Sequence, residues 1–342
     1  MSLSFGPGSY RFLLATLVVV HHTTSLGLGS AAVYSFFTLS GYWMHTVWVQ
    51  KYSRAANGYR ALISARLLRL LPMFWLISLF GCAVDYQLGR LPLPLPFQLG
   101  SWREIAHIFV SNTVLLGYNT LSYQAVGTAW SLDVELQFYL LLPLIAFVVK
   151  RFEALGGAVL GVCALFLPGT WLRESFFAYG IFFYFGAVAA NRRWVPSDRQ
   201  AMWAVCLVGI LLVLTICSGE FRSILLGGSR QTQMYRDWNQ FFNAALSVLL
   251  VPLTVWTAAR KSDAFDRMLG DMSYGVYLIH APMVLYYSAF YGRLPIAERL
   301  PYLFSLFALV FVASWLVWRF FDRPLLNVRD DFLRKTGVQR AL

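Results

Sequence analysis

Charged residues are scarce in this sequence of 342 residues, where Asp, Glu, Lys and Arg together make up only 13%. A typical soluble protein carries about twice that fraction. A chain of this length also has too little interior to hide its 58% of hydrophobic residues from water. The shortage of charge excludes an ordinary soluble protein and indicates that lipid is the solvent. We predict an all-α integral membrane protein that forms a single membrane-embedded domain over residues 1–342.

Acidic residues are scarcer than basic ones, with 16 Asp and Glu against 28 Lys and Arg. The basic residues form short clusters between apolar runs, which is typical of membrane topology rather than of a nucleic-acid-binding face. The sequence has only four cysteines, all inside apolar segments and without metal-ligand spacing. We therefore expect the lipid bilayer as a partner, and no nucleic acid, no metal and no permanently bound cofactor.

Apolar runs of about 17–25 residues predict about ten transmembrane helices. An eleventh apolar stretch, 105–118, is too short to span and is predicted to be an interfacial or re-entrant helix. The predicted spans cover residues 10–27, 31–50, 68–86, 127–149, 153–171, 175–191, 201–218, 241–259, 273–291 and 301–320.

The basic residues also predict the orientation of the chain. With these spans, twenty of the 28 Lys and Arg lie on the same side as the N-terminus and eight on the other side. By the positive-inside rule, the N-terminus and C-terminus are both cytoplasmic. The predicted location is multi-pass in the cell inner (cytoplasmic) membrane. The external loops are 87–104, which contains Pro92, Pro94 and Pro96, and 219–240.

Ionisable residues inside predicted spans are the first candidates for function, because they are costly in lipid. Arg11 and His22 are eleven residues apart, so they share one helix face with a rise of about 16 Å between them. This places Arg11 at the cytoplasmic surface and His22 near mid-membrane. A neutral histidine suits removal of a hydroxyl proton. The alternative is structural, with Arg11 reaching the interface and His22 bonded to a neighbouring helix.

Arg66 and Arg69 stand at the predicted start of the third span, on one helix face. Two arginines beside a helix N-terminus make a good phosphate site. Positive-inside topology explains both residues equally well without any function. Pro72 follows in the predicted first turns, where a missing N–H costs least.

Two further polar stripes lie on later spans. Ser131, Glu135 and Tyr139 are spaced i, i+4, i+8, while Asp133 points away and is open to a purely structural role. Glu135 lies several residues deep and needs a partner. The second stripe is Ser273, Tyr277 and His280 at i, i+4, i+7, for which a buried network that ties helices together is the alternative.

Five segments carry motifs that occur together in one protein family. In chain order they are Arg-x10-His at Arg11 and His22, an aromatic-rich Leu-Ser-Gly segment at 36–41, Arg-x-x-Arg at Arg66 and Arg69, Trp-Ser-Leu-x-x-Glu at 130–135, and Ser-Tyr-x-x-Tyr-Leu-x-His at 273–280. Together they resemble the acyltransferase-3 family of bacterial membrane O-acyltransferases, of the polysaccharide O-acetyltransferase type. We expect the chain to lack the fused extracytoplasmic esterase-like domain of some members.

The resemblance implies O-acetylation in polysaccharide biosynthesis. The donor would be cytoplasmic acyl-CoA, most often acetyl-CoA. The acceptor would be a carbohydrate hydroxyl of a cell-surface polysaccharide or exopolysaccharide, free or lipid-linked, and polysaccharide-assembly proteins would be partners. In this interpretation His22 is the base or a transient nucleophile, and Glu135 orients it or binds the sugar. The other predicted roles are donor binding by Arg11, Arg66 and Arg69, and substrate binding by Ser131, Tyr139, Ser273, Tyr277 and His280.

Two other classes of function fit parts of the pattern. A multi-helix secondary transporter of a small polar solute or glycan also places polar stripes at mid-membrane. However, no inverted repeat is visible in the sequence. A non-enzymatic scaffold in a polysaccharide-assembly complex would leave the intramembrane His22 and Glu135 without a purpose.

Overall fold

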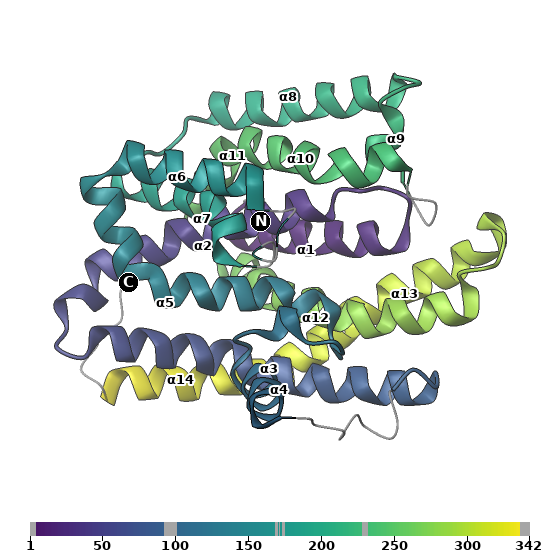
Figure 1. Ribbon diagram of the computed structural model, residues 1–342, viewed down its shortest axis with the longest axis horizontal. Coiled ribbons are helices and arrows are strands. Elements are labelled where there is room, and N and C mark those ends of the chain that lie inside the picture. The colour runs from purple at the N-terminus through teal and green to yellow at the C-terminus, as the bar shows by residue number, and fades with distance from the viewer. Residues whose placement is uncertain are drawn as a thin grey trace. The chain divides into compact units, whose positions relative to one another are not determined.

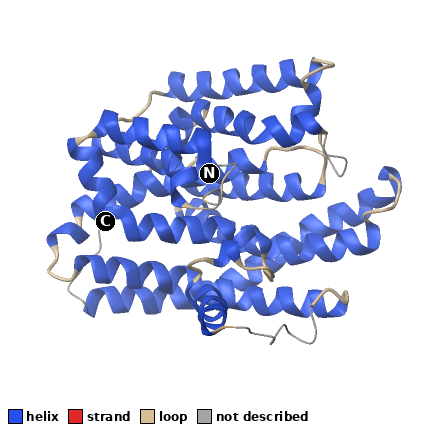
Figure 2. Cartoon of the chain, in the orientation of Figure 1, coloured by secondary structure: helices blue, strands red, loops and turns tan. Residues whose placement is uncertain are grey.

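The computed structural model describes residues 5–91, 101–167, 170, 172, 175–227 and 232–335. Within these ranges the chain consists of helices and loops, and its extended pairing is limited to an isolated antiparallel bridge between Leu26 and Leu226 (Figure 2). The prediction of an all-α protein is confirmed. Pro92, Pro94 and Pro96, in the predicted external loop 87–104, lie outside the described residues.

Nine of the predicted spans each fall on one α-helix, and the predicted span 241–259 falls on two consecutive helices, α10 and α11 (Figure 1). Short 3-10 turns occur at Tyr52–Arg54, Tyr118–Thr120 and Gly127–Ala129, and a π-helical turn, η5, covers Trp318–Asp322. The α-helices are α1 (Pro7–Thr23), α2 (Gly29–Gln50), α3 (Gly58–Gln87), α4 (Trp102–Val114), α5 (Trp130–Arg151), α6 (Glu153–Phe166), α7 (Phe176–Asn191), α8 (Asp198–Cys217), α9 (Arg222–Leu225), α10 (Gln233–Leu249), α11 (Val251–Ala258), α12 (Ala264–Tyr291), α13 (Ile296–Val317) and α14 (Arg323–Lys335).

Four helical stretches of the described chain are long and apolar enough to cross a membrane, namely α3, Gly127–Arg151, α8 and Ile296–Arg329. The pair α10 and α11 makes a fifth if it counts as one span, bent by 49°. Helices α6 and α7 are apolar but shorter. The protein therefore has several candidate membrane-spanning helices, whereas the number ten and the side of each terminus stay predictions.

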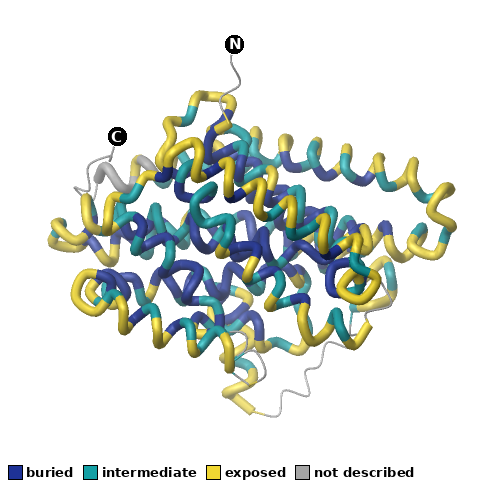
Figure 3. The backbone as a smooth tube through the Cα atoms, turned by 90° about the horizontal axis from the view of Figure 1, so that it is seen from above, coloured by how far each residue is buried: buried dark blue, intermediate teal, exposed yellow. Residues whose placement is uncertain are grey.

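Large apolar side chains on the outer faces of the helices support a lipid environment. Leu79, Phe166 and Phe304 are each 71% exposed. Buried and exposed positions alternate along the helices (Figure 3). In water such exposure would favour aggregation, whereas in a bilayer it is the expected outer surface.

Two helix ends differ from the sequence prediction. Helix α3 begins at Gly58, ten residues before the apolar run at 68, because its first turns are a polar extension that the apolar window does not detect. Helix α1 ends at Thr23 rather than at residue 27. There the hydroxyl groups of Thr23 and Thr24 donate to the carbonyls of Val19 and Val20, each at 2.8 Å, and Thr24 is already extended.

The chain divides into two compact units, each of which is built from several segments. Unit 1 comprises residues 1–49, 141–173 and 177–274, and unit 2 comprises residues 50–140, 174–176 and 275–342. The boundary falls within α5 and α12, so each of these helices contributes to both units. The single membrane-embedded domain stays a prediction.

In unit 1, the start of α1 is held by a carboxylate from the first turn of α12. Asp266 accepts hydrogen bonds from the backbone N–H groups of Gly8 at 3.0 Å and Ser9 at 2.7 Å, and from the Ser9 hydroxyl at 2.8 Å. Ser262 donates a further bond to it at 2.6 Å. Asp266 thereby satisfies N–H groups that the first turn of a helix leaves without partners.

Close approach of α2 and α7 in unit 1 requires glycine on both helices. A Cβ at Gly41 would lie 2.0 Å from the carbonyl oxygen of Phe183, and a Cβ at Gly186 would lie 2.0 Å from that of Thr38. Small residues at such crossings let helix backbones touch, as is common in membranes.

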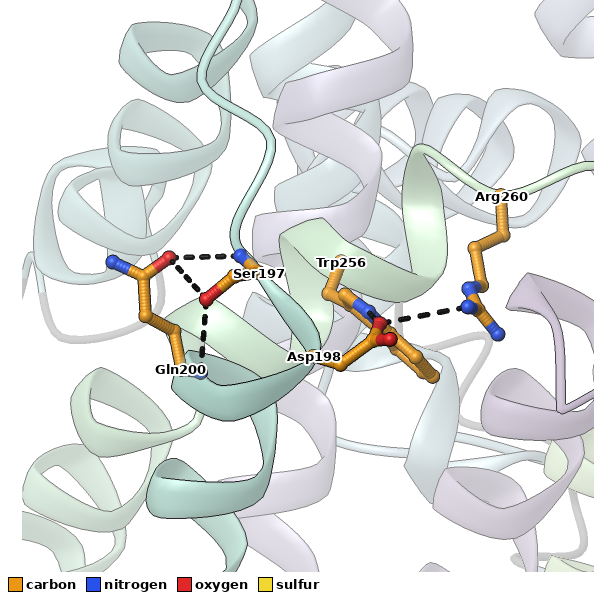
Figure 4. Close-up of polar contacts among 5 residues, drawn as sticks. All are labelled: Ser197, Asp198, Gln200, Trp256 and Arg260. Atoms are coloured by element: carbon orange, nitrogen blue, oxygen red, sulfur yellow. Dashed lines mark hydrogen bonds and ion pairs between the residues drawn. The ribbon is translucent and has the colours of Figure 1, made fainter.

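The start of α8 is tied to α11, also in unit 1 (Figure 4). Ser197 and Gln200 form a capping box at the N-terminus of α8. Asp198 accepts a hydrogen bond from the Trp256 indole at 2.7 Å and lies 3.5 Å from the Arg260 guanidinium. These contacts fix the register between the two helices.

In unit 2, the π-helical turn η5 connects α13 to α14, which packs along α3 (Figure 1).

Three helices with candidate site residues also contain an internal proline. These are Pro72 in α3, Pro143 in α5 and Pro282 in α12. Because α3 begins at Gly58, Pro72 stands deep inside its helix, and the expectation that it occupies the first turns is wrong.

Candidate functional site

Arg11 and His22 both lie on α1 in unit 1, as predicted. His22 is exposed and occupies the last turn of the helix, one residue before its end. Its position near the middle of a span is therefore not observed, because α1 stops at Thr23. The neighbouring His21 is partly buried, and its ring lies 4.8 Å from that of His22.

Arg11 is half-buried one turn inside the start of α1. Its guanidinium carbon lies 5.8 Å from the centroid of the Trp43 ring, a cation–π geometry. The arginine is thus in contact with α2 through Trp43. A Cβ at Gly270 would lie 3.0 Å from the Cα of Gly8, so the starts of α1 and α12 approach closely.

The loop that follows His22 is pinned by two buried asparagines of α10. Asn239 and Asn243 donate side-chain hydrogen bonds to the carbonyl of Gly27 at 2.9 and 2.8 Å. The side-chain oxygen of Asn243 accepts from the N–H of Ala31 at 3.0 Å, in the first turn of α2. Neither residue was predicted from the sequence. The available signal was the i, i+4 spacing of two asparagines beside an apolar run, which places both on one helix face.

In unit 2, Ser131 of α5 and Tyr277 of α12 meet. Their hydroxyl oxygens are 2.7 Å apart, and Tyr277 also donates to the carbonyl of Thr128 at 3.0 Å. Both side chains are buried. The structure therefore brings together residues of the two predicted stripes, which lie 146 positions apart in the chain.

Glu135, Tyr139 and Arg66 form a connected polar cluster in unit 2. The Tyr139 hydroxyl donates a short hydrogen bond to the Glu135 carboxylate. The Arg66 guanidinium carbon lies 5.7 Å from the centroid of the Tyr139 ring. Carboxylate, guanidinium and hydroxyl groups thus share one region of the bundle.

Arg66 has further basic neighbours. The positive charges of Arg69 and of Arg329, on α14, both act on it. The Nε of Arg66 is buried, and within the described residues it has no hydrogen-bond partner. Arg329 was missed by the sequence analysis because its proximity depends on the turn at η5.

The prediction that the arginine pair flanks a helix N-terminus is wrong. Arg66 and Arg69 lie eight and eleven residues after the first residue of α3, where backbone N–H groups are already bonded within the helix. Any anion there would be bound by side chains rather than by a helix terminus.

Ser273 and His280 of the second stripe are bonded along α12. The Ser273 hydroxyl, in unit 1, donates to the carbonyl of Gly270 at 2.6 Å. His280, in unit 2, is fully buried, and its Nδ1 lies 3.0 Å from the carbonyl of Val276. Its ring centroid is 6.0 Å from that of Tyr277. Within unit 2, the stripe therefore places Tyr277 beside His280.

Asp133 has the structural role that the sequence left open. Its carboxylate accepts hydrogen bonds from the backbone N–H of Asn119 at 3.1 Å and from the Gln137 side chain at 2.9 Å. In the same loop, the hydroxyl of Tyr118 accepts from the N–H of Val126 at 3.1 Å. Burial raises the pKa of Tyr118 to about 12, so the hydroxyl stays neutral. These bonds fix the loop that leads into Ser131 and Glu135.

Apolar helices around buried polar clusters define a multi-helix membrane protein. Residues 9–319 match the family model Acyl_transf_3, described as an acyltransferase domain, so the chain belongs to the acyltransferase-3 family. This confirms the resemblance inferred from the motifs.

Curated relatives agree with this family. The chain is similar to the O-acetyltransferase OatA of Staphylococcus aureus strains NCTC 8325 / PS 47, COL and MRSA252, with 21% identity over 351 residues in each case. The match covers 90% of this chain and 55% of each relative. The chain thus spans just over half the length of these relatives. No solved structure matches it.

Proposed function

We propose that this protein is an acyl-CoA-dependent O-acyltransferase that transfers an acetyl group to a sugar hydroxyl of a cell-surface polysaccharide or exopolysaccharide. The proposal assigns it to the bacterial inner membrane, with about ten spans and both termini in the cytoplasm. The observation that carries the proposal is the Arg66–Tyr139–Glu135 cluster inside apolar helices of an acyltransferase. The likeness to an O-acetyltransferase supports acetyl as the group transferred.

The donor would be bound by arginines. Arg66, Arg69 and Arg329, all in unit 2, would hold phosphates of acyl-CoA at the cytoplasmic side, and Arg11 in unit 1 stays a separate donor-binding prediction. The buried Nε of Arg66, which lacks a partner in the described chain, supports an anionic ligand at this place. The thioester would reach His22 through the pantetheine arm, since Arg11 and His22 are about 16 Å apart along α1.

His22 would activate the acceptor. Its neutral imidazole takes the proton of the sugar hydroxyl while the oxygen attacks the thioester carbonyl. The C–S bond then breaks, and the CoA sulfur receives the proton. The same residue could instead carry the acetyl group first as acyl-histidine. In the predicted orientation the last turn of α1 is the extracytoplasmic end, which suits an acceptor that enters from outside.

The remaining candidates would position the substrates. Glu135 would orient His22 or bind the sugar, with Tyr139 holding its carboxylate. Tyr277 and His280 would contact the substrate, and Tyr277 would donate to the developing oxyanion once its hydroxyl turns away from the carbonyl of Thr128. Ser131 is hydrogen-bonded to Tyr277 and would set its direction. Ser273 would contact substrate only after its bond to Gly270 breaks.

Turnover of acetyl-CoA by the purified full chain in detergent tests this proposal. Wild type should release free CoA, and His22→Ala should release at least a hundredfold less, because general-base catalysis contributes about that factor or more. The control is His107→Gln, which changes an exposed histidine of α4. Near-normal turnover by His22→Ala would overturn the mechanism. No turnover by either protein, with solute uptake in vesicles, would identify a transporter.

A further inference from the structure

A cavity of about 400 Å³ lies among α3, α12 and α13, entirely within unit 2. It is formed by the last turns of α3 and α12 and by the middle turns of α13, so it lies toward one end of α3 and α12. None of the predicted site residues lines it. The lining residues are Phe80, Val84, Gln87, Met283, Tyr286, Tyr287, Tyr291, Tyr302, Ser305, Leu306 and Leu309.

The lining is aromatic and uncharged. Four tyrosines contribute, and the rings of Tyr291 and Tyr302 are stacked with centroids 4.0 Å apart. Tyr286 and Tyr302 are 43% and 44% exposed. A tyrosine offers a flat apolar face together with a polar hydroxyl. The absence of charge from this lining excludes the phosphates of acyl-CoA as its ligand.

Tyr287 adds a buried hydroxyl group to the lining of the cavity. The residue is 6% exposed, and its hydroxyl has no hydrogen-bond partner within the described part of the chain. Buried hydroxyl groups almost always have a partner. Gln87 brings a side-chain amide to the same cavity. A ligand with hydroxyl groups of its own would satisfy the Tyr287 hydroxyl, whereas a hydrocarbon chain would leave it unpaired.

We propose that this cavity binds a neutral sugar residue of the acceptor glycan. A pyranose ring has an apolar C–H face that stacks on tyrosine and an edge of hydroxyl groups that bond to Tyr287 and Gln87. The inference rests on the proposed function and deepens it by naming the acceptor subsite. In the predicted orientation, the ends of α3 and α12 at the cavity are extracytoplasmic, on the side from which the acceptor would come.

Photo-crosslinking of the full chain in lipid nanodiscs tests the proposal. The probe is chitotetraose or cellotetraose that carries a diazirine, and the matched apolar probe is farnesol with the same diazirine. Crosslinked peptides are mapped by mass spectrometry, and unlabelled tetrasaccharide is the competitor. Three proteins are compared, namely wild type, Tyr287→Phe and the control Tyr86→Phe, whose ring is exposed beside Gln87 but outside the lining.

We expect at least one sugar probe to label the peptides of Tyr286 or Tyr302, with loss of label on competition. Tyr287→Phe should reduce labelling at low probe concentration about tenfold, the usual effect of one hydrogen bond. Tyr86→Phe should label like wild type. Labelling by farnesol that sugar does not displace, no labelling of the cavity by either sugar, or equal labelling of Tyr287→Phe would each overturn the proposal.

Acetyl-CoA turnover, measured on the same samples, separates this inference from the proposed function. Turnover that depends on His22 without sugar labelling overturns the cavity assignment alone. Sugar labelling that depends on Tyr287, without any turnover, supports the glycan site and refutes acetyl-CoA as the donor.

Discussion

Replacing Asn243 with leucine should weaken the connection that follows His22. The wild-type amide is fully buried and bonds to four groups, namely the carbonyl of Gly27, the N–H of Ala31 and both the backbone carbonyl and the side chain of Asn239. Leucine has almost the same volume, so little cavity forms. The carbonyl of Gly27 keeps its bond from Asn239. The N–H of Ala31 and the side-chain oxygen of Asn239 lose theirs.

Each buried group left without a partner costs about 1–3 kcal/mol, so two of them lower the free energy of unfolding by about 2–6 kcal/mol. The assay is thermal unfolding of the purified protein in detergent, followed by acetyl-CoA turnover below the unfolding transition. The midpoint should fall clearly in Asn243→Leu and turnover should fall with it, because the loop fixes the end of α1. Asn112→Leu, at an exposed position of α4, should change neither.

A second substitution at Asn243 tests the same hydrogen bonds in part. Near the pH at which its carboxyl is neutral, Asn243→Asp keeps an acceptor for the N–H of Ala31 and has one O–H donor in place of the two N–H donors of the amide. Its midpoint should therefore lie between those of wild type and Asn243→Leu. An unchanged midpoint in Asn243→Leu would refute the reasoning, since it would mean that these bonds contribute nothing to the fold.

Two other predictions concern Asp266 and Arg329. Burial raises the pKa of Asp266, but hydrogen bonds from Ser262, Ser9 and Gly8 outweigh burial and hold it below its usual value. Its carboxylate therefore stabilises the fold fully above about pH 4 and progressively less as the pH falls below that. Asp266→Asn should lower the unfolding midpoint at pH 7, and the difference from wild type should shrink below pH 4; a constant difference would contradict this. Arg329→Gln should raise the KM for acetyl-CoA about 3–10-fold with little change in kcat. Arg60→Gln, exposed in the first turn of α3, is its control, and an equal KM in both variants would remove Arg329 from the donor site.

The sequence located the helices well because lipid requires long apolar runs. It located their ends poorly where a helix continues into water or stops inside an apolar run. The first turns of α3, from Gly58, are polar and fell outside the apolar window, so the arginine pair was assigned to a helix terminus. At Thr23 the reverse occurred, because the hydrogen bonds that end α1 involve residues that look compatible with lipid.

The candidate site was predictable to the extent that its residues repeat along one helix. Ser131, Glu135 and Tyr139 follow helical spacing, and the bond between Tyr139 and Glu135 is the i, i+4 contact that this spacing allows. The meeting of Ser131 with Tyr277 depends on how two helices pack, and a single sequence does not reveal that. Arg329 was undetectable for the same reason, since it reaches Arg66 only through the packing of α14 against α3.

The internal prolines have a mechanical consequence. Pro72 follows Arg69 by three residues, Pro143 follows Tyr139 by four, and Pro282 follows His280 by two. Each proline removes one backbone donor, so the carbonyl four residues earlier loses its helical bond and the helix bends there most easily. The three points of easiest bending therefore stand next to the polar side chains. We expect any change in the distances among these side chains to occur by bending at these prolines rather than by unfolding of a helix.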